Sequence, residues 1–271
     1  RKLTSVITSR GCPFNCSFCA SSKLAGIRWR ARSPESIVDE VEEIKRRFGI
    51  GAVGFVDDNF TLNPKRAIEV CEEILRRNLD VKWWCLSRVD TIVKHEEMVK
   101  SMARAGARLD FIGIESASQA ILDSYGKKIT LEMARKAIEI LKKHKIRVWA
   151  SFIIGYLDET KEMIQNTIKL AKKLRPHFAQ FSILTPYPGT ELFENVKDKL
   201  LHLKWELYDC LHPVLKTTYV TPKELRKYLL KAYASFYLRP SMLVRSKIRG
   251  IRSLSFISSL VYPSFKLTFR R

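Results

Sequence analysis

The apolar residues of this 271-residue chain gather in six short, nearly continuous runs, and an amphipathic stretch follows each run. Continuous apolar character is typical of parallel strands covered on both faces, and repeated strand–helix alternation favours an α/β fold. We therefore expect six strands, at "LTSVIT" from Leu3, "GAVGFV" from Gly51, "VKWWCL" from Val81, "LDFIGI" from Leu109, "RVWASFII" from Arg147 and "FAQFSIL" from Phe178.

Capping residues mark where several of the intervening helices begin. Ser33 and Asn63 each precede a proline, which is the order expected for an N-cap residue followed by the first helical position. "TPKE" at Thr221–Glu224 has the spacing of a capping box. These signals predict helices after the first, second and sixth strands.

The number of strand–helix units sets the architecture. Eight units would close a barrel, but the alternation stops near Leu184 after six. A doubly wound nucleotide-binding sheet would carry G-x-G-x-x-G after its first strand, and none is present. We predict an open, partial (β/α)6 TIM-type barrel over residues 1–190. A mostly helical C-terminal extension at 191–238 and a basic amphipathic tail at 239–271 follow it.

The loop after the first strand, about 9–33, is the longest and contains "RGCPFNCSFCA". Its cysteines, Cys12, Cys16 and Cys19, have the spacing C-x3-C-x2-C. A structural zinc site closes with four ligands, yet the nearest histidine along the chain is His95. Three thiolates on a cubane iron–sulfur cluster instead leave one iron open, as at catalytic metal sites. The loop is therefore expected to hold a reactive metal centre.

"RGCPFNCSFC" after a short first strand resembles the radical S-adenosylmethionine (SAM) superfamily. The resemblance implies that Cys12, Cys16 and Cys19 hold a 4Fe–4S cluster whose open iron binds SAM. Reductive cleavage of SAM then gives a 5′-deoxyadenosyl radical, which abstracts hydrogen from an unactivated C–H bond. It also implies that Phe18 packs by the adenine and that an external electron donor is needed.

Further motifs of the same family lie at the predicted strand ends, where barrel enzymes build their sites. They are "FVDDNFTLNPKRA", "SRVD", "GIES" and "SFIIGYLDET". The resemblance implies SAM contacts from Asp57 or Asp58, Arg88, Glu115, Ile153 and Gly155. Structural interpretations stay open: the two aspartates as a cap and turn, Glu115 as the partner of an arginine, and Gly155 as a packing residue.

"LTPYPGTELFE" and the segment from "KWELYDCLHPV" to "AYASFYLRPSMLVR" are similar to the cobalamin-binding branch of the family. That branch includes methyltransferases at unactivated carbons and anaerobic ring-forming enzymes of tetrapyrrole biosynthesis. Since the chain begins at Arg1 and a cobalamin domain precedes the barrel in that branch, we expect such a domain upstream; relatives of the branch without cobalamin are the alternative. The alternatives are a tRNA-modifying enzyme of the methylthiotransferase type and a non-enzymatic zinc or iron–sulfur sensor.

The remaining cysteines do not indicate a second cluster. Cys71 lies on the apolar face of a predicted helix and Cys85 lies in a predicted strand, so both are expected in the core. Cys210 stands alone. Isolated cysteines in an intracellular protein are typical of reduced thiols, which argues against a disulfide framework.

The net charge of +21 points to a polyanionic partner. Residues 239–271 contain eight Lys or Arg and no Asp or Glu, with apolar residues between them. We expect this tail to contact an anionic membrane surface, with a helical cap on the barrel and, less favoured, nucleic acid as alternatives. No run is long enough to span a bilayer. The expected location is the cytoplasm, at the inner membrane face, with a small-molecule or lipid substrate.

Overall fold

The computed structural model describes residues 2–239 and confirms the open α/β barrel. Six parallel strands form one sheet in the order β1, β4, β5, β6, β7, β8. Their bounds are Leu3–Val6, Ala52–Phe55, Lys82–Ser87, Ala107–Glu115, Arg147–Ile154 and Phe178–Ile183. A two-stranded antiparallel ribbon of β2 (Ser9–Arg10) and β3 (Arg30–Ala31) frames the loop that contains the cysteines.

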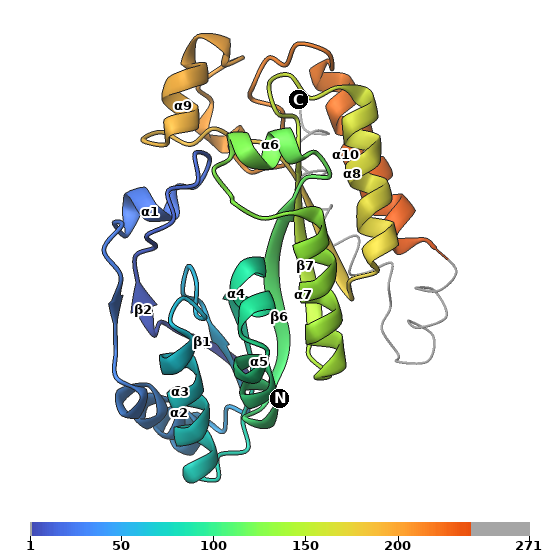
Figure 1. Cartoon of the computed structure of the whole chain (residues 1–271). Helices are drawn as coiled ribbons and strands as arrows, with labels where there is room; N and C mark the ends of the chain where they lie inside the picture. The colour runs from blue at the N-terminus through green and yellow to red at the C-terminus, as the bar shows by residue number, and fades with distance from the viewer. Residues whose placement is uncertain (1, 240–271) are drawn as a thin grey trace.

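Helices return the chain between the strands. They are α2 (Pro34–Phe48), α3 (Pro64–Arg76), α4 (Val89–Lys94), α5 (Glu96–Arg104), α6 (Gln119–Ser124), α7 (Leu131–Lys143) and α8 (Lys161–Leu174). The short helices α1 (Ser21–Leu24), α6 and α9 (Glu191–Val196) lie together at the end of the sheet where the strands finish (Figure 1). We call this end the mouth of the barrel.

The predicted helix starts are confirmed. The side chains of Ser33 and Asn63 accept hydrogen bonds from the backbone N–H groups of Ser36 and Arg66. Thr221 opens α10 (Pro222–Tyr237) with both hydrogen bonds of the capping box. Cys71 and Cys85 are fully buried, as expected of core residues.

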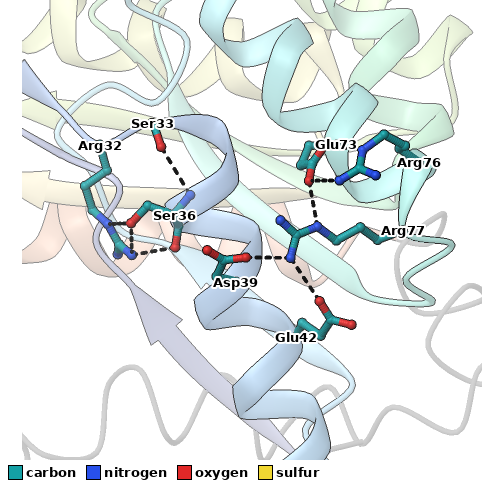
Figure 2. A network of polar contacts seen from close by, with 8 residues as sticks. All are labelled: Arg32, Ser33, Ser36, Asp39, Glu42, Glu73, Arg76 and Arg77. Atoms are coloured by element: carbon teal, nitrogen blue, oxygen red, sulfur yellow. Dashed lines mark hydrogen bonds and ion pairs between the residues drawn. The ribbon is translucent and has the colours of Figure 1, made fainter.

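A bridging arginine fastens α2 to α3 (Figure 2). Arg77 donates to Asp39 at 2.6 Å and to Glu42 at 3.0 Å on α2, and to Glu73 on α3 at 2.6 Å. Its side chain is only 18 % exposed, so these charges are partly shielded from water. The contact ties the C-terminal end of α3 to the middle of α2.

Helix α10 covers the free edge of β8. The hydroxyl of Tyr237 donates to the carbonyl of Ala179 at 2.8 Å and accepts from its N–H at 3.1 Å. Tyr233 does the same with Phe181, at 2.9 and 3.2 Å. Four residues rise about 6 Å along a helix and two residues about 6.6 Å along a strand, so the spacings match. Two phenols thus satisfy backbone groups that an edge strand leaves unpaired.

The predicted boundaries at 190 and 238 remain predictions. The buried face of α10 belongs to the same hydrophobic core as the barrel. Between α9 and α10 lie two 3-10 turns and a single antiparallel bridge between Leu200 and Leu215. The predicted membrane-contacting tail falls almost wholly outside the described residues. Within residues 2–239, the helices are too short or too polar to cross a membrane.

One carboxyl group, that of Asp110, is buried within the sheet. Asp110 is fully buried on β6, where Cys85 of β5 is its register partner and the Cys85 thiol approaches its Oδ1 at 3.6 Å. Burial raises the pKa of Asp110 to about 7, against the weaker stabilisation of the anion by Ser87 and Cys85. The folded protein therefore keeps this proton at pH values where the unfolded chain has lost it.

We expect Asp110→Asn to stabilise the protein progressively as the pH rises from 5 to 8. Between the unfolded pKa near 4 and the folded pKa near 7, Asp110 lowers the free energy of unfolding by about 1.4 kcal/mol per pH unit. Asparagine removes this dependence. The difference in unfolding free energy between variant and wild type should grow by about 3 kcal/mol over the range, measured by denaturant unfolding. The exposed Asp123→Asn is the control, and a difference that does not change with pH contradicts the assignment.

Candidate functional site

The loop of the three cysteines has a backbone that its sequence enforces. Gly11 has φ of +89°, and a Cβ there would overlap the carbonyl oxygen of Arg28. Cys12 donates its N–H to the carbonyl of Gly26 at 3.2 Å, and Cys19 donates to Cys16 at 3.0 Å. The loop is therefore held as a compact turn between β2 and α1.

Ser17 ties this loop to two other elements of the mouth. Its N–H donates to the carbonyl of Tyr125 at 3.1 Å, and its hydroxyl donates to the carbonyl of Ser124 at 3.0 Å. Its own carbonyl accepts from the N–H of Leu192 on α9 at 2.9 Å. One residue between two cysteines thus joins segments more than 100 positions apart in the chain.

The three thiols are half-buried and close enough to influence one another. Burial raises the pKa of Cys12, and the charges of Cys19, Cys16 and Asp58 raise it further. Burial also raises the pKa of Cys16, while the cations of Lys127 and Arg88 lower it. Thiolates are the ligand form of cysteine, so bound metal and these cations both favour the state that coordinates.

The thiols do not offer a ready site for a single ion. Within residues 2–239, no three His, Cys, Asp or Glu side chains lie close enough together to hold one metal ion. A zinc ion needs its ligands gathered around one point. A cluster bonds each thiolate through a different iron, so its cysteines stand further apart. Three half-buried, mutually interacting thiols on one loop are therefore suited to bind an iron–sulfur cluster.

The two aspartates after β4 occupy different environments. Asp57 is 2 % exposed and accepts from the N–H of Thr8 at 2.6 Å, the hydroxyl of Thr8 at 2.5 Å and the hydroxyl of Ser9 at 2.6 Å. Asp58 is exposed and near enough to Cys12 to raise the pKa of that thiol. Asp57 therefore holds the segment between β1 and β2 against the end of β4, and Asp58 is the carboxylate available to a ligand beside the cysteines.

Arg88, at the end of β5, is positioned from three sides. Its guanidinium lies 3.7 Å from the centre of the Phe14 ring, which belongs to the cysteine loop. It donates to Asp90 at 2.9 Å and to the carbonyl of Lys127 at 3.0 Å. A planar cation fixed in this way can bind a carboxylate with little loss of side-chain entropy.

Glu115 ends β6 in a left-handed conformation, with φ of +69°. Its Oε1 forms an ion pair with Lys127, and the side chains are 7 % and 9 % exposed. A Cβ on Gly113 would overlap both charged groups, so the pair occupies space that a side chain at this position would take. The expected arginine partner of Glu115 is thus a lysine, supplied by the loop after α6.

Aromatic and aliphatic side chains complete the wall beside the cysteines. The Phe18 ring lies 4.7 Å from that of Tyr125, and Ile153 packs in the same cluster. Gly155 has φ of +91°, and its N–H donates to Glu159 Oε2 at 2.5 Å. Burial raises the pKa of Glu159 to about 7. The turn after β7 is therefore closed by a glutamate that contacts its backbone.

Three residues of the site, Lys127, Tyr125 and Glu159, were not predicted from the sequence. Gly126, with φ of +66°, is a local signal for the turn that places Lys127, but the pairing with Glu115 is a tertiary contact. Of the predicted residues, Phe18, Asp58, Arg88, Glu115 and Ile153 gather around the cysteine loop or its immediate neighbours. Asp57 and Gly155 form hydrogen bonds within the protein, as Arg88 and Glu115 also do.

We compared the sequence with models of protein families. The model of the radical SAM superfamily matches residues 6–171. The chain belongs to the radical SAM superfamily. The sequence is 45% identical over 242 residues to an uncharacterized methyltransferase, PH0819, of Pyrococcus horikoshii, covering 89% of this chain and 52% of that protein. It is 33% identical over 235 residues to the anaerobic magnesium-protoporphyrin IX monomethyl ester cyclase of Rubrivivax gelatinosus, covering 87% and 42%.

Among solved structures, the radical SAM methyltransferase TsrM of Kitasatospora setae, with cobalamin and a [4Fe-4S] cluster bound, superposes with a TM-score of 0.67 at 23% identity. The match covers 72% of this chain and 39% of that one, and it supports the fold. This radical SAM chain spans about half the length of the PH0819 protein and less of the other two.

We expect Lys127→Met to lower the free energy of unfolding by about 3 kcal/mol, because it leaves the buried Glu115 carboxylate unpaired. Glu115→Gln/Lys127→Met should recover most of that loss, since the double variant buries no charge. Both are measured by denaturant unfolding. A cost below about 1 kcal/mol for Lys127→Met, or no recovery in the double variant, contradicts a buried ion pair.

Proposed function

We propose that this barrel is the catalytic unit of an enzyme in which Cys12, Cys16 and Cys19 hold a 4Fe–4S cluster with SAM at its open iron. When bound, the cluster and SAM supply a 5′-deoxyadenosyl radical for hydrogen abstraction from an unactivated C–H bond. The observation that carries the proposal is the grouping of three half-buried thiols with Asp58, Arg88 and Lys127 at the strand ends. The reductive cleavage of SAM also requires an external electron donor.

The chain's own residues have separable tasks in this proposal. Asp58 accepts the ammonium group of the methionine moiety, because it is exposed beside Cys12 while Asp57 is fully bonded. Arg88 offers its guanidinium to the carboxylate of the same moiety. Phe18, fixed against Tyr125, provides an apolar surface for the adenine. The pair of Glu115 and Lys127 holds the strand end rigid beneath them.

We infer that the substrate is hydrophobic. The inward side of the sheet presents Trp84, Phe111 and Trp149, all half-buried, and the Phe111 and Trp149 rings meet edge to face at 5.3 Å. A separate apolar cavity of about 170 Å³ adjoins Trp149 near the strand starts, away from the mouth, and is lined by Leu109, Trp149, Phe178, Ala179, Gln180, Tyr233 and Tyr237. Such a wall suits an apolar, planar or lipid-like molecule.

The proposed reaction is cobalamin-linked methyl transfer, or C–C bond and ring formation, with cobalamin held by a domain upstream. The names of the methyltransferase and cyclase relatives support these two reaction types. The competing tRNA-modification role gains no support from the described residues after Thr190, which form helices and one isolated bridge where a β-barrel RNA-binding domain would be needed.

Anaerobic reconstitution with iron and sulfide tests the cluster. Wild type should bind about four irons per chain and form 5′-deoxyadenosine from SAM with a strong reductant. Cys16→Ala should lose deoxyadenosine formation. Cys210→Ser, which changes another half-buried thiol, should retain both iron and activity. Equal loss in the two variants, or an intact cluster that leaves SAM uncleaved, contradicts the proposal.

The two aspartates should separate binding from stability. We expect Asp58→Asn to raise the KM for SAM about 10-fold with unchanged unfolding, because it removes one charge-assisted contact. Asp57→Asn should instead lower the free energy of unfolding by about 2 kcal/mol, since the anionic acceptor of three hydrogen bonds is lost. The opposite pattern in SAM kinetics and denaturant unfolding assigns the ligand contact to Asp57.

A further inference from the structure

Basic side chains gather at the end of the barrel opposite the mouth. In a parallel sheet with returning helices, the C-terminal ends of the helices and the starts of the strands share one end (Figure 1). Five exposed residues lie there and form what we call the basic face: Arg104 at the end of α5, Arg108 in β6, Lys145 after α7, Arg147 at the start of β7 and Arg175 after α8.

The carboxylates nearby are already engaged. Glu96 pairs with Lys143 at 2.7 Å and with His144 at 2.9 Å, and Glu97 pairs with Lys100 at 3.3 Å. Within the described part of the chain, no member of the basic face has a carboxylate within ion-pair distance. The positive charge of this face is therefore uncompensated by the protein.

Helix macrodipoles account for only part of this charge. A cation at a helix C-terminus is stabilised there, which explains Arg104, Lys145 and Arg175 at the ends of α5, α7 and α8. Arg108 and Arg147 belong to strands, where no such field exists. Three members of the face, Arg104, Arg108 and Lys145, also line a hollow of about 440 Å³ with Lys100, Ala103 and His144. A concave surface lined with one sign of charge concentrates its potential toward an anionic partner.

The same end of the molecule exposes large apolar side chains. Phe48, the last residue of α2, is 59 % exposed, and Leu238, directly after α10, is 51 % exposed. Contact with nucleic-acid phosphates requires cations but no exposed aliphatic groups. Apolar side chains among cations are the combination found where a protein lies in the headgroup region of a bilayer.

The chain also leaves the described region at this end. Tyr237 forms hydrogen bonds with Ala179 near the start of β8, so α10 ends at the side of the sheet opposite the mouth. Beyond it, residues 240–271 add seven Lys or Arg and no Asp or Glu. The basic face and the sequence of residues 240–271 therefore carry the same sign of charge.

We propose that the basic face docks on an anionic phospholipid bilayer and turns the mouth of the barrel away from the membrane. The basic face is independent of the radical chemistry, since it contains no residue of the mouth. Each Lys or Arg near an anionic surface contributes roughly tenfold or less to binding, and the contributions of several cations accumulate.

Co-sedimentation of the full chain with vesicles tests the proposal. Wild type should bind vesicles of equal parts phosphatidylcholine and phosphatidylglycerol and not vesicles of phosphatidylcholine alone. Arg104→Gln/Lys145→Gln/Arg147→Gln should lower the partition coefficient about 100-fold. These three side chains are exposed, and thermal unfolding by circular dichroism checks that the fold is kept.

Lys199→Gln/Lys204→Gln/Lys216→Gln is the matched control, because it removes three exposed lysines from the segment between α9 and α10. It should bind like wild type. Equal losses in the two triple variants, binding that ignores the anionic lipid, or a bulk tRNA that binds wild type while the anionic vesicles do not, would each overturn the proposal.

Discussion

The parallel direction of six neighbouring strands is the constraint from which the rest of this structure follows. It sends each strand end to the same edge, so the cysteine loop, Asp58, Arg88 and Glu115 meet although they are far apart in sequence. It also sends the ends of the returning helices to the opposite side. The parallel topology thus places the candidate site at one end of the barrel and the basic face at the other.

Glu115 shows how the candidate site is stabilised. A non-glycine residue with positive φ is strained, and a buried carboxylate is costly unless it is paired. Lys127 pairs with it, and Gly113 leaves the space in which the pair lies. The strain and the desolvated charge are tolerated because three residues on two segments are matched to one another.

Local signals were sufficient for the six strands of the sheet and for three helix starts. Apolar runs located the six strands, and capping residues located the helices that begin at Pro34, Pro64 and Pro222. Local signals could not show which of Asp57 and Asp58 is free to contact a ligand, because the two residues are adjacent and chemically identical. Their difference arises from Thr8 and Ser9, about fifty residues away, which only the folded chain brings to Asp57. Lys127 could not be predicted for the same reason, because its role depends on the ion pair with Glu115.

The two tyrosines of α10 have a consequence for the behaviour of the protein in solution. An uncovered strand edge recruits strands from other chains, and here phenol hydroxyls occupy that edge at Ala179 and Phe181. The protection lasts only while α10 stays docked. Partial detachment of this one helix would expose a ready template for self-association while the barrel core remained folded. Self-association through the edge of β8 therefore depends on the local stability of α10 more than on the global stability of the barrel.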